Sequence, residues 1–144
     1  MASQSTEELM KLLRSAKNTK DLKDFTSMLS DASFPATFPD YLMAKMQCAD
    51  MSAAELISRA QIQRNYGYQI LDGRRNPSRD KVIAFSLALH LDVNETQRAL
   101  MIAKNGQLYS KNKRDSILIF ALEKKLSVIQ TNELLYEMGE AILS

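Results

Sequence analysis

The sequence predicts an all-α protein, and three observations support this fold class. Glycine and proline are scarce, with four and three residues in a chain of 144, so few positions would interrupt a helix. The segments between them are rich in Leu, Ala, Lys, Glu and Met, which favour helices over strands. Apolar residues recur at spacings of three and four, the period of an amphipathic helix, and no strand pattern is present. We therefore expect a helical domain with helical additions at both ends.

The composition also limits the class of protein. The longest uncharged apolar run, Ile117–Leu122, is far too short to span a bilayer, and the N-terminus lacks the basic and apolar regions of a signal peptide. The single cysteine, Cys48, cannot form an internal disulfide or a cysteine-based metal site, and we expect it to be buried by helix packing. These features predict a cytoplasmic protein that has no membrane contact and no metal or other cofactor.

Residues 1–37 are expected to form an N-terminal helical extension. Its first helix begins at a capping box, Ser5-Thr6-Glu7-Glu8, and a second short helical pattern follows. The segment 31–40, DASFPATFPD, contains two prolines and marks the break before the next element. Two roles remain open for the extension: packing on the main domain through Phe34 and Phe38, or dimerisation.

Residues 38–106 are expected to form the main domain, which begins with two short helices. The first starts near Pro39, because proline suits a first helical turn, and runs to about Ala49. The second covers Ala53–Ala60 and begins at a capping box that Ser52 opens. The residues of the first helix expected to face inward are Leu42, Met46 and Ala49.

Three more helices complete this domain. The third covers Arg64–Leu71 and ends at Asp72-Gly73, where glycine can take the left-handed conformation. The fourth is capped at Asn76-Pro77-Ser78. The fifth is capped by Asn94 and ends at Asn105-Gly106. The core residues expected in and after the fourth helix are Val82, Phe85, Leu87 and Leu89.

Residues 107–144 are expected to add two helices as a C-terminal extension. The first, Arg114–Lys125, contains the apolar run ILIFAL, and the second is capped by Ser127 and Gln130. Helices this apolar must be buried, either on the main domain or against another copy of the chain, so packing and dimerisation both remain open. The apolar residues of the second helix are Leu134, Leu135, Met138 and Ile142.

Positive charge is concentrated in two segments, although the net charge of the chain is only +2. Residues 59–81 hold six basic and two acidic residues, and residues 104–114 hold four basic residues and no acid. These segments could bind a polyanion on one face of the protein. The alternative is that they are loops whose charges are simply solvated. The same two alternatives apply to Lys111, Lys113 and Arg114, which are either a second phosphate contact or a solvated loop.

The segment Ser52–Ser78, SAAELISRAQIQRNYGYQILDGRRNPS, combines two short helical patterns, a turn and a basic exit. It resembles the helix-turn-helix of the phage-repressor/Cro-like family (lambda repressor-like, XRE-type). The exit loop Gly73-x-x-Asn76-Pro77-Ser78 fits without a gap, and the match continues over about residues 40–103. The resemblance implies a five-helix DNA-binding domain of a bacterial or phage regulator. The matching core and turn positions are Leu56, Ile62 and Ile70.

Three positions depart from the family pattern. Ile57 stands where the family usually has alanine, Gln61 where the turn usually has glycine, and Gly67 where the third helix usually has a branched apolar residue. The resemblance implies that positions 57 and 67 face each other, so their sizes are exchanged and core volume is conserved. Gly67 still costs about 1 kcal/mol relative to alanine, and a left-handed Gln61 costs about 1–2 kcal/mol.

The third helix carries the candidate DNA-reading residues. Tyr66 and Ile70 share one face, which we assign to the core. Arginine offers a fork to guanine, and Gln or Asn can pair with adenine. The opposite, base-reading face comprises Gln63, Arg64, Asn65, Tyr68 and Gln69, of which the resemblance places Arg64, Asn65 and Gln69 at the family's base-reading positions. The residues expected to contact phosphates, which position the protein without reading sequence, are Arg74, Arg75, Asn76 and Arg79.

We expect a protein without enzymatic activity. His90, the only histidine, ends the fourth helix, where similar domains often have glycine, so a capping or surface role is expected. The predicted function is a sequence-specific regulator of transcription that binds double-stranded DNA as a homodimer through helix 64–71. The alternative is an adaptor or antitoxin-like module that holds a protein partner through its apolar flanks. It predicts functional effects at Ile119, Phe120 or Leu135.

Overall fold

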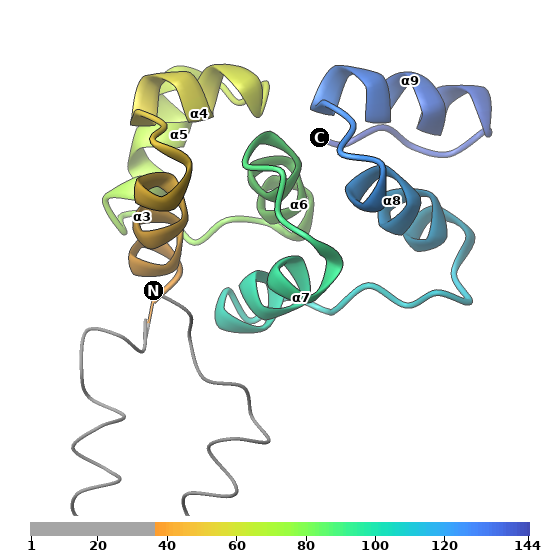
Figure 1. Cartoon of the computed structure of the whole chain (residues 1–144), viewed down its shortest axis with the longest axis horizontal. Coiled ribbons are helices and arrows are strands. Elements are labelled where there is room, and N and C mark those ends of the chain that lie inside the picture. Colours follow the sequence, from red (N-terminus) through yellow and green to blue (C-terminus); the bar gives the residue numbers. More distant parts are fainter. Residues whose placement is uncertain (1–36) are drawn as a thin grey trace, which may run out of the picture. The chain divides into compact units, whose positions relative to one another are not determined.

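The computed structural model describes residues 37–144 of the chain. Every regular element in this range is a helix, so the all-α prediction is confirmed for the described part (Figure 1). No helix between residues 37 and 144 has the length and apolar character needed to cross a membrane. The capping box at Ser5–Glu8 and the side chain of Phe34 lie outside the described residues. The helices are α3 (Phe38–Ala49), α4 (Ala53–Arg59), α5 (Arg64–Leu71), α6 (Arg79–Ala88), α7 (Val93–Ile102), α8 (Lys113–Glu123) and α9 (Val128–Glu137).

The central element is α6, which lies between α3, α4 and α5 on one side and α8 and α9 on the other (Figure 1). Every residue of Val82–Ala88 is buried, as expected of a helix that is apolar around its whole circumference. The one hydroxyl among them, on Ser86, donates to the Val82 carbonyl at 2.8 Å and so leaves no donor unpaired. The predicted core residues that are confirmed as buried are Val82, Phe85, Leu87 and Leu89.

The helix α3 is held against α7 and the core. Phe38 is only 3% exposed and packs against Phe85 with 6.2 Å between ring centroids, so it belongs to the domain itself. The Tyr41 hydroxyl donates to the Glu95 carbonyl at 2.9 Å. Burial, assisted by the negative charge of Glu95, raises the pKa of Tyr41 to about 12.

Residues 107–144 pack in the same compact unit as residues 38–106. Ile117, Leu118 and Leu135 belong to the core that also holds Phe85. These three residues therefore pack on the main domain, while Phe120, Ile129 and Tyr136 of the same segment remain exposed. Met138 and Ile142, which were expected within the last helix, lie beyond the end of α9 and are exposed.

Most helix starts follow the predicted capping residues. The side chains of Ser52, Ser78 and Ser127 each accept a hydrogen bond from the backbone N–H three residues later. Ser127 and Gln130 form a complete capping box, because the Gln130 side chain also accepts from the Ser127 N–H at 2.9 Å. At Ser52 only one half of the box is present, since the Glu55 carboxylate pairs with an arginine of α4.

Three local predictions are wrong. Cys48 is exposed, because it lies on the side of α3 opposite the buried Leu42 and Met46. Ala49, the last residue of α3, is exposed as well. The residue that caps α7 is Asp92, two positions before the predicted Asn94, and its side chain accepts from the Glu95 N–H at 2.7 Å.

Candidate nucleic-acid interface

The candidate interface is built on α4, α5 and the turn that joins them. Gln61 in this turn has φ of 57°, the left-handed conformation that glycine usually supplies. Its side-chain Nε2 donates to the Ser58 carbonyl at 3.0 Å, and its backbone N–H donates to the same oxygen at 3.1 Å. Ile62 follows and is 7% exposed, so the turn is anchored in the core on the side opposite Gln61.

The two helices cross closely because Gly67 lies directly against Ile57. A Cβ added at Gly67 would lie 2.8 Å from both the Cγ1 and Cγ2 atoms of Ile57, well inside van der Waals contact. The expectation that positions 57 and 67 face each other is confirmed. The backbone of α5 can approach α4 this closely only because position 67 has no side chain.

The buried and exposed faces of α5 divide as the sequence predicts except at Tyr68, which packs partly against the core as Tyr66 does. Gly67 and Ile70 are buried, and Tyr66 is half-buried against the core with the Lys81 ammonium 5.8 Å from its ring centroid. The residues predicted to read bases share the other side of the helix. Of these, three are exposed and two are half-buried; in chain order they are Gln63, Arg64, Asn65, Tyr68 and Gln69.

Contacts within the protein orient several of these side chains. Gln63 caps α5, since its side-chain oxygen accepts from the Tyr66 N–H at 2.8 Å. The Arg64 guanidinium lies 5.9 Å from the centroid of the Tyr68 ring, one helical turn further on, and cation–π attraction favours this position. The Gln69 side-chain oxygen accepts from Arg75 Nε at 3.2 Å.

The loop after α5 presents two arginines. Gly73, with φ of 85°, ends the helix as predicted. Arg74 is 67% exposed and pairs with Asp72 at 2.7 Å, and its hydrogen bond lowers the pKa of that carboxyl group. Arg75 is also exposed, and its backbone N–H donates to the Gln69 carbonyl at 3.1 Å. Both guanidinium groups lie exposed at the end of α5, and each has one partner within the protein, Asp72 for Arg74 and Gln69 for Arg75.

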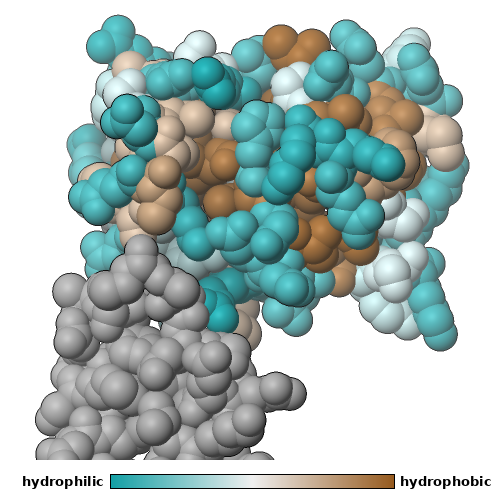
Figure 2. All heavy atoms as spheres, viewed as in Figure 1, coloured by the Kyte–Doolittle hydropathy of each residue, from teal (hydrophilic) through white to brown (hydrophobic). Residues whose placement is uncertain are grey.

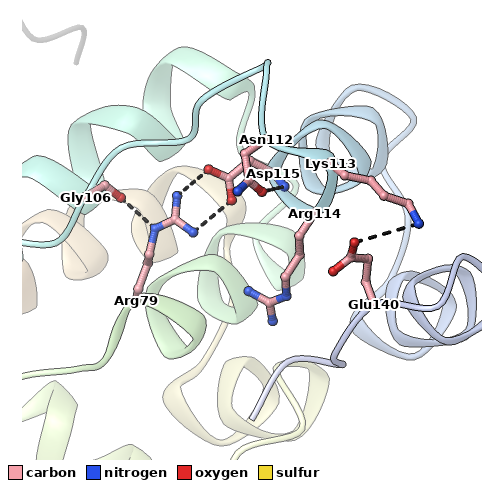
Figure 3. Close-up of a pocket in the computed structure, with 7 residues that line it drawn as sticks. All are labelled: Arg79, Gly106, Asn112, Lys113, Arg114, Asp115 and Glu140. Atoms are coloured by element: carbon pink, nitrogen blue, oxygen red, sulfur yellow. Dashed lines mark hydrogen bonds and ion pairs between the residues drawn. The ribbon is translucent and has the colours of Figure 1, made fainter.

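Arg79 and Asn76 have different roles from those expected. The Arg79 guanidinium donates two hydrogen bonds to the buried Asp115 carboxylate, at 2.8 and 2.9 Å, and two more to the carbonyls of Gly106 and Gln107 (Figure 3). Asn76 donates through Nδ2 to the Ala103 carbonyl at 3.2 Å. Both side chains join α6 and its preceding loop to later parts of the fold, so we do not assign them to phosphate contact.

The carboxyl group of Asp115 responds to this arrangement. Burial alone raises the pKa of Asp115, but the hydrogen bonds from Arg79 and from the Tyr109 N–H outweigh burial, and the net pKa lies below its ordinary value. Asp115 therefore stays ionised and holds Arg79 in place.

A polar recess of about 470 Å³ lies beside this pair, between the start of α8 and the segment after α9 (Figure 3). Its cationic side chains have partners: Lys113 donates to the Met138 carbonyl at 2.7 Å, and Arg114 forms a two-point ion pair with Asp80 at 3.0 and 3.1 Å. Lys111 is exposed. Of the three residues considered as a second phosphate contact, Lys113 and Arg114 thus serve to hold the C-terminal segment.

The residues considered for catalysis do not assemble a site. His90 has φ of 54° and follows Leu89, the C-cap of α6, so it takes the helix-ending position expected for it. Its carbonyl accepts from the Lys125 ammonium at 2.8 Å. Among residues 37–144, no group of three His, Cys, Asp or Glu side chains is placed to hold a metal ion.

Sequence reasoning missed two features of this region. The contact between Arg75 and Gln69 spans six residues, and no pattern in the sequence predicts it. The partner of Arg79 lies 36 positions later in the chain, and no local pattern indicates it. Comparisons of the chain with protein-family models, with curated proteins and with solved structures found no match.

Proposed function

We propose that this protein is a sequence-specific, double-stranded DNA-binding regulator of transcription that inserts α5 into the major groove. One observation carries the proposal: α5 has a buried face that fixes its orientation, and an outer face composed of polar residues without an acid. Such a face suits binding to double-stranded DNA, because acidic side chains there would repel the phosphates.

The proposal includes a repressor-like arrangement of five helices, α3 to α7. Three features support it: the left-handed residue in the turn between α4 and α5, the close crossing at Gly67, and the glycine that ends α5. A recognition helix must project its outer face past its neighbours into a groove about 12 Å wide. In this arrangement α4 crosses the DNA backbone while α5 enters the groove.

Each outer residue of α5 has a proposed role. Arg64, held over Tyr68, presents its fork to guanine, and the exposed Asn65 amide can both donate to and accept from adenine. Gln63 and Gln69 contribute amide donors. Arg74 and Arg75 contact phosphates at the end of α5 and fix the register.

We propose a homodimer on two half-sites separated by about one helical turn of DNA, because a single eight-residue helix contacts only a few base pairs. Repression by occlusion of the promoter is the simplest mechanism. A palindromic motif in bound DNA, together with a dimer mass in sedimentation, is the expected result.

The first experiment is selection of bound duplexes from a random pool with the full chain, at one stated salt concentration. Arg64→Ala should lose one defined base preference, with a loss of about 1–3 kcal/mol at that position. The matched control is Lys124→Ala, which removes one exposed positive charge from the end of α8 and should leave the motif unchanged. If wild type enriches no motif, or if both variants behave alike, the proposal fails.

A second candidate function is supported by the apolar surface of α8 and α9. Phe120, Ile129 and Tyr136 are 48%, 53% and 81% exposed, and apolar side chains are visible among polar ones on this side of the molecule (Figure 2). Leu135 is fully buried and is no longer part of this hypothesis. In the adaptor function, Phe120→Ser would abolish the activity in the cell while Arg64→Ala would be silent.

A further inference from the structure

We propose that Arg75 sets the base preference of Gln69, so that Gln69 selects guanine and not adenine. The inference rests on the proposed function and adds the specificity of one contact. Arg75 acts here as a positioning residue, in addition to any phosphate that it contacts.

The geometry joins these two residues at two points. The Arg75 backbone N–H donates to the Gln69 carbonyl at 3.1 Å, which places the loop residue beside the last turn of α5. The Arg75 side chain then reaches back, and its Nε donates to Gln69 Oε1 at 3.2 Å. Backbone and side chain together hold the Gln69 amide in one orientation.

The chemistry of the donor fixes which end of the amide faces Arg75. A guanidinium has N–H donors and no acceptor, so only the oxygen of the amide can face it. The Gln69 NH₂ group is therefore the end that remains available to DNA. The oxygen retains a second lone pair, but the positive guanidinium beside it disfavours the partly positive amino hydrogens of a base.

This orientation distinguishes the purines. In the major groove, guanine presents two neighbouring acceptors, N7 and O6, whereas adenine presents the N7 acceptor beside the N6 amino donor. An unrestrained glutamine pairs with adenine because it can donate and accept at once. Gln69, whose oxygen is held by Arg75, matches the two acceptors of guanine.

The neighbouring amides show the same contrast. The Gln63 oxygen accepts from the neutral Tyr66 N–H, which occupies one of its two lone pairs and places no positive charge beside the other. Asn65 is exposed, and its amide can both donate and accept, which suits adenine. The half-site is thus expected to hold guanines opposite Arg64 and Gln69 and an adenine opposite Asn65.

The test compares four proteins in the same random-pool selection: wild type, Gln69→Ala, Arg75→Met and Arg74→Met. Gln69→Ala identifies the base position that Gln69 reads, because the preference there should disappear. Arg75→Met frees the Gln69 oxygen while it keeps the aliphatic stem. Arg74→Met is the control, since it removes a charge from the adjacent position whose partner is Asp72 and not Gln69.

The expected result is specific to one base position. Wild type should prefer guanine there, and Arg75→Met should shift the ratio of adenine to guanine on the order of tenfold toward adenine. Arg74→Met should weaken all sites equally and leave that ratio unchanged. An enriched wild-type motif whose ratio does not shift in Arg75→Met, or shifts equally in Arg74→Met, overturns the inference but leaves the proposed function intact. Absence of any wild-type motif removes the proposed function itself.

Discussion

Adding a methyl group at Gly67 tests the close crossing of α4 and α5. Alanine is more favourable than glycine inside a helix by about 1 kcal/mol, so propensity alone predicts that Gly67→Ala stabilises the protein. The structure predicts the opposite. The new Cβ would lie 2.8 Å from two Ile57 atoms and 2.9 Å from a third, Cδ1.

The clash cannot be relieved by a change of rotamer alone. Two of the three atoms, Cγ1 and Cγ2, branch from the same β-carbon, and a β-branched side chain is stiff at χ1. Ile57 is also only 3% exposed, so it has no solvent to move into. Overpacking of this kind costs about 1–3 kcal/mol, which leaves Gly67→Ala destabilised by up to about 2 kcal/mol after the gain in propensity.

A double-mutant cycle separates the two contributions. In the Ile57→Ala background the clashing atoms are absent, so Gly67→Ala should now stabilise by about 1 kcal/mol. The free energy of unfolding of the full chain is measured in urea by far-ultraviolet circular dichroism, with equal m-values as the check on two-state behaviour. If Gly67→Ala stabilises equally in both backgrounds, the two residues are not in contact and the packing argument is refuted.

Three further predictions concern stability. Asp115→Asn removes the charge that holds Arg79 and should lower the free energy of unfolding by about 3 kcal/mol. Because the pKa of Asp115 is depressed in the folded state, wild type should lose this stabilisation as pH falls below about 4. If the stability of the variant falls with acid in the same way as that of wild type, the ion pair is not the cause. His90→Gly should stabilise the protein by about 1 kcal/mol and so raise its thermal midpoint, because φ at position 90 is 54°, which glycine adopts without strain. His90→Ala should not raise the midpoint. Tyr41 has a pKa of about 12, so wild type should lose stability as pH rises from about 10, and ultraviolet titration should find one late tyrosine that is missing from Tyr41→Phe.

Local signals predicted much of the candidate interface. The bounds of α5 follow from a turn before Arg64 and a glycine after Leu71, both of which act over a few residues. The packing of Ile57 against Gly67 was predicted because the resemblance pairs those positions and a change in one is matched by a change in the other. In both cases the information lies within one helix-turn-helix segment.

Contacts between residues far apart in the sequence were not predicted. The residue type and position of Arg79 suggested a phosphate contact, and only the fold shows that its guanidinium is paired with Asp115. The start of α7, in contrast, is specified locally: Asp92 and Glu95 have the spacing of a capping box, which is a stronger signal than a lone asparagine at position 94. Cys48 was assigned by residue type, although the phase set by Leu42 and Met46 already placed it on the outer side of α3.

The first turns of α6 and α8 carry the same dipeptide, Arg-Asp, at residues 79–80 and 114–115. Arg79 pairs with Asp115 at 2.8 Å, and Arg114 pairs with Asp80 at 3.0 Å. This reciprocity discriminates between alignments of the two helices: a slip of one residue would place Arg79 against Arg114 in one direction, or Asp80 against Asp115 in the other. The two pairs therefore stabilise the native docking of the C-terminal helices and also raise the energy of the nearest incorrect one.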